Sequence, residues 1–145
     1  MAETTEFELV SPDRLLVSEP VEMVVVPGLE GDFGVLPRHA PMLSTVRPGV
    51  IDIHEGGHVK TRLFVAGGFA EVTEERCTVL AEEAFALDDV TPEAANERLR
   101  SARDDVAEAD DAFAKARAEK AVGVAEALVA AVGRWRSLPK GAFVY

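Results

Sequence analysis

The sequence predicts a β + α fold in two parts, an antiparallel β-sandwich or flattened barrel followed by a pair of α-helices. The first observation is a series of short apolar runs, separated by turn signals at a spacing of roughly eight to twelve residues. The second is a change of pattern near Leu87, after which apolar residues recur every three or four positions. We therefore divide the chain into residues 1–86 and residues 87–145.

The predicted strands are short runs rich in β-branched and aromatic residues, and they stop at proline, glycine or charged turn residues. Pro27 and Gly28 are expected to end the strand before them. The Glu55–His58 turn contains two glycines that can take positive φ, as in a β-hairpin. The predicted strands are Phe7–Val10, Leu15–Val17, Val21–Val26, Met42–Val46, Val50–His54, Val59–Ala66, Phe69–Val72 and Cys77–Ala81.

The stretch Gly31–Pro41 predicts a rigid, shaped loop between two strands, because it contains two glycines and two prolines. Its apolar side chains are expected to tuck beneath the loop, and Asp32, Arg38 and His39 are expected to point outward. Such a loop suits the presentation of a surface to a partner. An ordinary strand connection without a partner is the alternative.

The second part predicts two amphipathic helices with thin, alanine-rich apolar seams. Thr91 is expected to cap the first helix, with Pro92 at its first position. The first seam is Ala95, Leu99, Ala102, Val106, Ala109 and Phe113, and the second is Ala121, Ala125, Leu128, Val132 and Trp135. We place the turn at Asp110–Ala112; one long helix is the alternative, because neither glycine nor proline lies between Pro92 and Gly123.

Composition bounds the class of protein. The chain has 145 residues, and its single cysteine, Cys77, is expected to be a small buried apolar group. The N-terminus lacks a secretory signal, and no stretch approaches the roughly twenty apolar residues of a membrane helix, so we expect a cytoplasmic protein without membrane insertion. The formal net charge of −11 disfavours nucleic acid and anionic lipid surfaces as partners.

Charge is distributed unevenly along the chain. Residues 1–90 contain 6 basic and 17 acidic side chains, and residues 91–111 contain 3 and 7. Residues 112–145 contain 6 basic and 2 acidic side chains. The C-terminal segment is therefore the only basic part of the chain.

The residues offer no pattern typical of an independent enzyme. His39, His54 and His58 do not have the spacing of a standard metal site. The sequence contains no Gly-x-Ser-x-Gly, no His-Glu-x-x-His and no glycine-rich phosphate loop followed by lysine. We expect no catalytic residue, no metal and no cofactor, and an acidic β module joined to a helical pair suits an adaptor or a regulatory subunit.

Four motifs occur in a specific order over residues 5–85: Gly31–Pro41 (GDFGVLPRHAP), Arg47–Gly49 (RPG), Phe64–Val72 (FVAGGFAEV) and Val79–Glu82 (VLAE). Together they closely resemble the epsilon subunit of the bacterial F-type ATP synthase. The resemblance implies a ten-stranded β-sandwich and a C-terminal helical hairpin, in a non-catalytic subunit of the central rotor stalk that couples c-ring rotation to the catalytic head.

The resemblance also implies partners for each part. Residues 1–86 would bind the gamma subunit and the c-ring, at the cytoplasmic face of the bacterial inner membrane. The c-ring would face Glu30, Gly31, Asp32 and Phe33, and the gamma subunit would face His39, Ala40, Pro41 and Met42.

In this family the helical hairpin can extend along gamma toward the beta and alpha subunits and inhibit ATP hydrolysis. The basic second helix fits that role, with Lys115, Arg117, Lys120, Arg134 and Arg136 as the inhibitory residues. A solvated basic face without inhibitory work is the alternative.

Some members bind ATP through a Leu/Ile-Asp-x-x-Arg-Ala motif at the start of the hairpin. Here Thr91 and Pro92 replace the arginine and alanine, so no nucleotide site is predicted; Asp88 and Asp89 are the only candidates for contact with a nucleotide. A different class of protein also fits the composition: a free-standing β-sandwich that binds a ligand and oligomerises through its helices.

Overall fold

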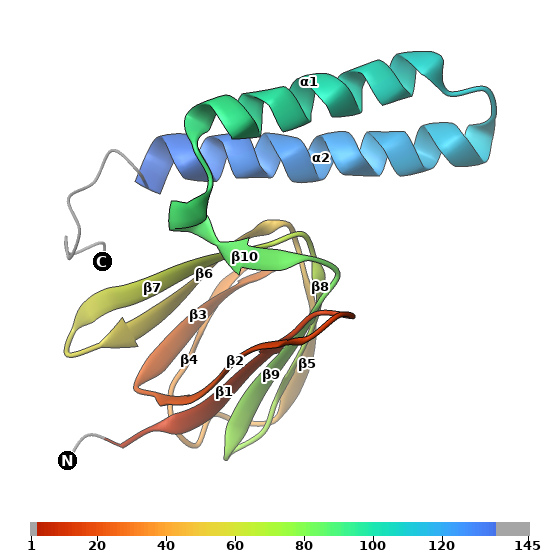
Figure 1. The fold of residues 1–145 in the computed structure, drawn as a ribbon. Helices are drawn as coiled ribbons and strands as arrows, with labels where there is room; N and C mark the ends of the chain where they lie inside the picture. The colour runs from red at the N-terminus through yellow and green to blue at the C-terminus, as the bar shows by residue number, and fades with distance from the viewer. Residues whose placement is uncertain (1–2, 136–145) are drawn as a thin grey trace.

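The computed structural model describes residues 3–135 of the chain. Within this range ten strands precede a short 3-10 helix and two α-helices (Figure 1). The strands are β1 (Thr5–Val10), β2 (Leu15–Val21), β3 (Met23–Gly28), β4 (Gly31–Val35), β5 (Met42–Val46), β6 (Gly49–Glu55), β7 (His58–Val65), β8 (Gly68–Val72), β9 (Arg76–Ala81) and β10 (Ala84–Ala86). The helices are η1 (Leu87–Asp89), α1 (Pro92–Glu108) and α2 (Ala112–Trp135).

The strands form one rolled sheet in the order β10-β7-β6-β3-β5-β8-β9-β1-β2, and β4 pairs with β3 beside this path. Strands β1 and β9 run parallel, whereas the other paired strands are antiparallel. The prediction of a predominantly antiparallel β-sandwich is confirmed. Its interior is filled by alternate side chains of the strands, including Phe7, Leu9, Val24, Ile51 and Val79.

A second apolar cluster joins the helices to the sandwich. It contains Phe64 from β7, Leu87 from η1, and Leu128 and Val132 from α2. The rings of Phe64 and Phe85 stack beside it, with centroids 5.4 Å apart. The hairpin therefore lies across one end of the sandwich, with α2 as the inner helix and α1 as the outer one (Figure 1).

The predicted loop Gly31–Pro41 is wrong in its first half, because Gly31–Val35 forms strand β4. Strand β3 also includes Pro27 and ends at Gly28, whereas the predicted strand stops at Val26. Both segments belong to one β-hairpin, in which Pro27 pairs with Asp32 and Gly28 with Gly31. Backbone pairing across this hairpin outweighs the local tendency of proline and glycine to end a strand.

The helical turn lies at residues 109–111, which agrees with its predicted position and excludes one long helix. Side-chain caps mark both helix starts: the Ala94 amide donates to Thr91 Oγ1 at 3.1 Å, and the Ala114 amide donates to Asp111 Oδ1 at 2.7 Å. Because the turn separates α1 from α2, the predicted first seam does not continue to Phe113, and the prediction is wrong at that residue. Phe113 lies on α2 and is 75% exposed.

Candidate interaction surfaces

The tip of the β3–β4 hairpin carries the four residues predicted to face the c-ring. Glu30 lies in the turn, Gly31 takes a φ of 141°, and Phe33 packs partly against the sandwich core. Asp32 accepts a hydrogen bond from Arg47 Nη2 at 2.6 Å. Asp32 is thus engaged within the chain, whereas Glu30 has no ion-pair partner among residues 3–135.

Arg47 stiffens this tip from the neighbouring turn. Besides Asp32, its guanidinium donates to the carbonyl oxygen of Gly28, and its amide donates to the carbonyl oxygen of Pro27 at 2.9 Å. Leu29 lies in the tip and is 65% exposed, although the sequence had not marked it as a site residue. The exposed part of the tip therefore combines one leucine with two carboxylates, Glu30 and Asp32, of which Asp32 is paired with Arg47.

The residues predicted to face gamma follow a strained bend. Arg38 has a φ of 65°, which is uncommon for a non-glycine residue, and its guanidinium pairs with Glu3 at 2.8 Å. His39 is half-buried with Nδ1 2.7 Å from the Ala40 carbonyl oxygen. Ala40 and Pro41 are exposed, but Met42 packs partly against the core. The four residues do not form one exposed patch.

A row of apolar side chains crosses the outer surface of four adjacent strands. Phe69 on β8 pairs with Leu80 on β9, Leu80 with Val10 on β1, and Val10 with Leu15 on β2. On β5, Leu43 pairs with Glu71 of β8 and extends the row. The exposed fraction of Leu43 is 78%. We call this surface the apolar face: Val10, Leu15, Leu43, Phe69 and Leu80.

The apolar face was missed in the sequence, although the sequence contains a signal for it. In a strand, successive side chains point to opposite faces. Two adjacent apolar residues, such as Met42 and Leu43 or Val79 and Leu80, therefore place one side chain outward. Val79 is fully buried, whereas Leu80 is 55% exposed. Contiguous exposed apolar side chains are typical of an interaction site.

A groove of about 520 Å³ lies between α2 and the sandwich. A smaller hollow of about 320 Å³ lies on the apolar face, and Phe69 lines both. The groove is mainly apolar, and its lining includes Leu29, Val46, Pro48, Phe69, Val124 and Ala127.

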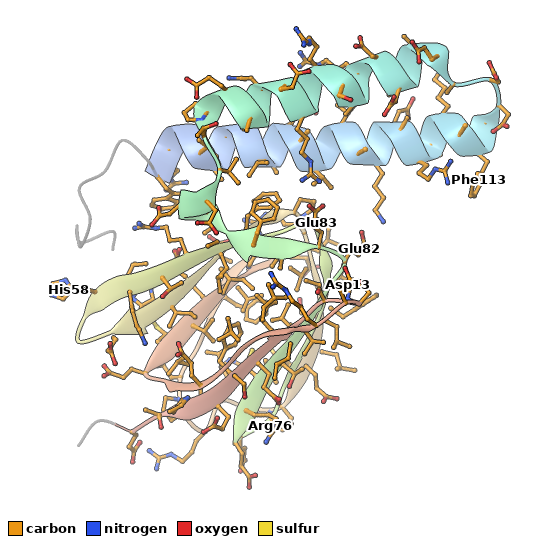
Figure 2. The ribbon with its side chains drawn as sticks, in the orientation of Figure 1. Asp13, His58, Arg76, Glu82, Glu83 and Phe113 are labelled. Atoms are coloured by element: carbon orange, nitrogen blue, oxygen red, sulfur yellow. The ribbon has the colours of Figure 1, made fainter. Side chains whose placement is uncertain are left out.

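Two ion pairs tie the hairpin to the turn between β9 and β10. Arg98 on α1 donates two hydrogen bonds to the Glu83 carboxylate, at 3.0 and 2.7 Å. Lys120 Nζ on α2 lies 3.0 Å from Glu82 Oε1. Figure 2 shows both glutamates on the side of the sandwich that faces α2. Lys120, a predicted inhibitory residue, is therefore engaged with the sandwich.

The other predicted inhibitory residues are spread along α2. Lys115 is exposed near its start, and the Arg117 guanidinium lies 5.4 Å from the centroid of the Phe113 ring. Arg134 stacks on Trp135 in the last turn, at 4.6 Å from the ring centroid. Arg136 lies outside the described residues. Among the described residues, Lys115, Arg117 and Arg134 do not gather into a single patch.

A buried charged pair lies on the helix-facing side of β6 and β7. Arg62 Nε is 3.6 Å from Asp52 Oδ1, and the Arg62 guanidinium lies 4.5 Å from the centroid of the Trp135 ring. Nearby His54 is only 7% exposed. Burial lowers the pKa of His54, and Arg62 lowers it further, whereas Asp52 opposes the shift. The end of α2 thus rests on a charged group of the sandwich.

The structure provides no reactive or metal-binding cluster among residues 3–135. No group of three histidine, cysteine, aspartate or glutamate residues there could hold a metal ion. Cys77 is fully buried, and burial raises the pKa of its thiol to about 12. Asp88 and Asp89 are exposed on η1, next to Thr91, which caps α1. None of the described helices is long and apolar enough to cross a membrane.

Comparison with known proteins gives consistent matches. Residues 4–87 match the family described as ATP synthase, Delta/Epsilon chain, beta-sandwich domain. The chain is 66% identical over 131 residues to the ATP synthase epsilon chain of Rhodospirillum rubrum, covering 90% of this chain and 98% of that one. The epsilon chain of Paramagnetospirillum magneticum is 59% identical over 132 residues, covering 91% and 99%.

A solved structure agrees with this match. A chain in the Euglena gracilis mitochondrial ATP synthase, described as OSCP/F1/c-ring in rotational state 1, superposes with a TM-score of 0.74. The two chains are 27% identical, and the superposition covers 89% of this chain and 81% of that one.

Proposed function

This chain belongs to the ATP synthase delta/epsilon family, and we propose that its sandwich joins the gamma subunit to the c-ring. It is an epsilon chain, a non-catalytic subunit of the central stalk. We place it at the cytoplasmic face of the bacterial inner membrane, held there through its partners.

The observation that carries the proposal is the apolar face. Gamma would cover Leu43, Phe69 and Leu80, whose side chains are 78%, 65% and 55% exposed in the isolated chain. Removing these side chains from water supplies the main favourable term for association. His39, Ala40, Pro41 and Met42 would border this contact, because they lead directly into β5.

The β3–β4 tip is the proposed contact with the c-ring. Its acidic position is Glu30 together with Asp32, and the Asp32–Arg47 pair supports a tip that keeps its shape under load. Leu29 adds an apolar contact at the same tip. A contact that transmits torque needs a rigid hairpin, because a flexible hairpin would bend instead of transmitting the force.

The helical hairpin is the proposed inhibitor of ATP hydrolysis. For that role it would leave the sandwich and carry Lys115, Arg117, Lys120, Arg134 and Arg136 toward the beta and alpha subunits. The modest strength of its docking supports this: exposed ion pairs such as Lys120–Glu82 each contribute up to about 1 kcal/mol. A bistable element needs states separated by only a few kcal/mol. No nucleotide or other cofactor is proposed.

The test of stalk binding uses Leu43→Glu and Phe69→Glu, each in the full chain, and the cognate gamma subunit. A charge on the apolar face is expected to raise the Kd for gamma at least about tenfold. The control is Phe113→Glu, which places the same charge at another exposed apolar side chain, at the far end of the hairpin (Figure 2). Unchanged affinity of Leu43→Glu and Phe69→Glu in isothermal titration would contradict the proposal.

A further inference from the structure

The face of α2 that meets the sandwich carries an apolar seam. Leu128 and Val132 are buried in the second apolar cluster, and Trp135 packs against the same cluster from the last turn of the helix. Positions three and four residues apart lie on one side of a helix, so these three side chains form a continuous row. The seam therefore runs to the end of α2.

The sandwich surface beneath this seam changes from apolar to charged along β6 and β7. Val50 pairs with Phe64, which belongs to the second apolar cluster, and Val50 packs against that cluster. Two residues further along, and so on the same face of the sheet, Asp52 pairs with Arg62. The Arg62 guanidinium lies 4.5 Å from the centroid of the Trp135 ring. The last apolar residue of the seam thus rests on a charged pair.

This pair is more buried than the other ion pairs among residues 3–135. The Asp52 side chain is 4% exposed and that of Arg62 is 17% exposed, whereas each side chain in the other pairs is at least 25% exposed. Arg62 Nε lies 3.6 Å from Asp52 Oδ1, which is too long for a hydrogen bond. Arg62 Nε and Nη2 are both buried and donate to no residue of the described range.

Two effects of opposite sign meet where Trp135 covers Arg62. The attraction between the cation and the aromatic ring favours the docked helix. The same ring keeps water from N–H groups that lack a hydrogen-bond acceptor, and this burial disfavours the docked helix. Apolar residues of similar volume are often as favourable as a buried ion pair, or more so. The charged end of the interface therefore holds α2 less tightly than an apolar end would.

We infer that the Asp52–Arg62 pair is a release point, which weakens the docking of α2 so that the hairpin can leave the sandwich. This inference rests on the proposed inhibition of ATP hydrolysis by the released hairpin. Replacing both charges with apolar side chains then keeps the hairpin on the sandwich. Removing only the cation leaves the buried Asp52 carboxylate without Arg62 and speeds release. If the pair merely filled space beneath Trp135, both changes would speed release.

The experiment measures hydrogen exchange at the amides of residues 128–132 in the full chain, because release of the hairpin exposes this part of α2. The double variant Asp52→Leu and Arg62→Met is expected to slow exchange at least about fivefold, and Arg62→Met alone is expected to speed it at least about fivefold. Circular dichroism checks that each variant is folded.

The matched control is the double variant Glu8→Leu and Arg76→Met. It replaces another ion pair between neighbouring strands with the same kinds of side chain. Arg76 lies at the end of the sandwich away from the helices (Figure 2). Exchange at residues 128–132 is expected to stay within about twofold of wild type in this control.

The outcomes separate this inference from the proposed inhibition. Wild-type or faster exchange in the variant Asp52→Leu and Arg62→Met overturns the release point, whatever the hairpin does to ATP hydrolysis. If exchange slows as expected, ATP hydrolysis by the assembled complex is expected to rise at least about twofold, because fewer hairpins are released. Slower exchange with wild-type hydrolysis supports the release point and overturns inhibition by the hairpin.

Discussion

Gly68 shows how a single residue positions the apolar face. Its φ is 145°, and an added Cβ would lie 2.0 Å from the carbonyl oxygen of Leu80. This close approach is the antiparallel pairing of β8 with β9, in which Phe69 stands opposite Leu80. No L-amino acid with a side chain fits there without moving the strand.

Gly68→Ala is therefore expected to destabilise the protein by about 2–4 kcal/mol, because β8 and β9 must separate to accept the methyl group. The measurement is urea unfolding followed by circular dichroism. Gly123→Ala is the control, since its Cβ meets open space in a helix and is expected to stabilise by up to about 1 kcal/mol. Equal stability of Gly68→Ala and wild type would show that β8 can shift freely.

The buried thiol of Cys77 is expected to make the stability of the protein depend on pH. Burial raises its pKa from 9.0 to about 12, so the folded state favours the neutral thiol. The contribution of the neutral Cys77 thiol to the free energy of unfolding is complete below pH 9 and is lost as the pH rises toward 12. Relative to Cys77→Ala, the wild-type free energy of unfolding is expected to fall by up to about 1.4 kcal/mol per pH unit in that window. Parallel alkaline unfolding curves for the two proteins would contradict a buried thiol.

At the scale of the element, the β3–β4 hairpin is set by its pairing and braced by Arg47. The Leu29 amide donates to the Thr45 carbonyl oxygen at 2.9 Å, which links the tip to β5. Arg47 reaches across to Asp32 and to the Gly28 carbonyl oxygen from the turn that follows β5. One side chain therefore holds two strands of the tip together.

Arg47→Ala is expected to loosen this tip without unfolding the sandwich, because the core residues are untouched. Hydrogen exchange at the Leu29 amide should rise by about tenfold or more. Arg76→Ala provides the control, since it removes an exposed arginine that pairs with Glu8 on the distant β1–β9 pair. Equal exchange at Leu29 in both variants would show that the backbone alone holds the tip.

At the scale of the whole molecule, the hairpin is held by a modest interface. The second apolar cluster contains large side chains such as Phe64 and Leu128, but much of its helical part is alanine or valine. Two exposed ion pairs to Glu82 and Glu83 add to it. Small apolar side chains bury little area each, so we expect the separation of the docked hairpin from the sandwich to cost little free energy.

The double variant Glu82→Gln and Glu83→Gln is expected to release the hairpin more often, because both ion pairs are lost. Hydrogen exchange in α2 should accelerate by about threefold to thirtyfold. Glu97→Gln is the matched control, since its partner Arg100 lies within α1 and the pair does not cross to the sandwich. Unaltered exchange in the double variant would show that apolar packing alone holds the hairpin.

Much of the fold could be read along the chain. Alternating apolar residues located most of the strands, and the predicted Thr91–Pro92 cap agrees with the structure. The turn predicted at Asp110–Ala112 overlaps the observed turn at residues 109–111. The two glycines of the β6–β7 turn have φ values of 61° and 78°, as their hairpin setting predicts. These features depend on neighbours close in sequence, and local propensity therefore determines them.

The functional surfaces depended on contacts between distant segments. Strand β4 exists because residues 31–35 pair with β3, against the tendency of the flanking proline and glycines. The sequence predicted no ion-pair partner for Asp32 or Lys120. In the structure, Asp32 pairs with Arg47, and Lys120 pairs with Glu82. Such partners are chosen by the folding of the chain, which no local pattern encodes.

By itself the sequence determined the fold class, the division of charge along the chain and the ordered motifs that mark the family. Which outward side chains gather into the apolar face, and where the groove against α2 opens, depends on the three-dimensional arrangement of the strands and helices. The reason is physical: periodicity tells which side of its own strand or helix a residue occupies, whereas a surface arises from the register between strands and the docking of helices.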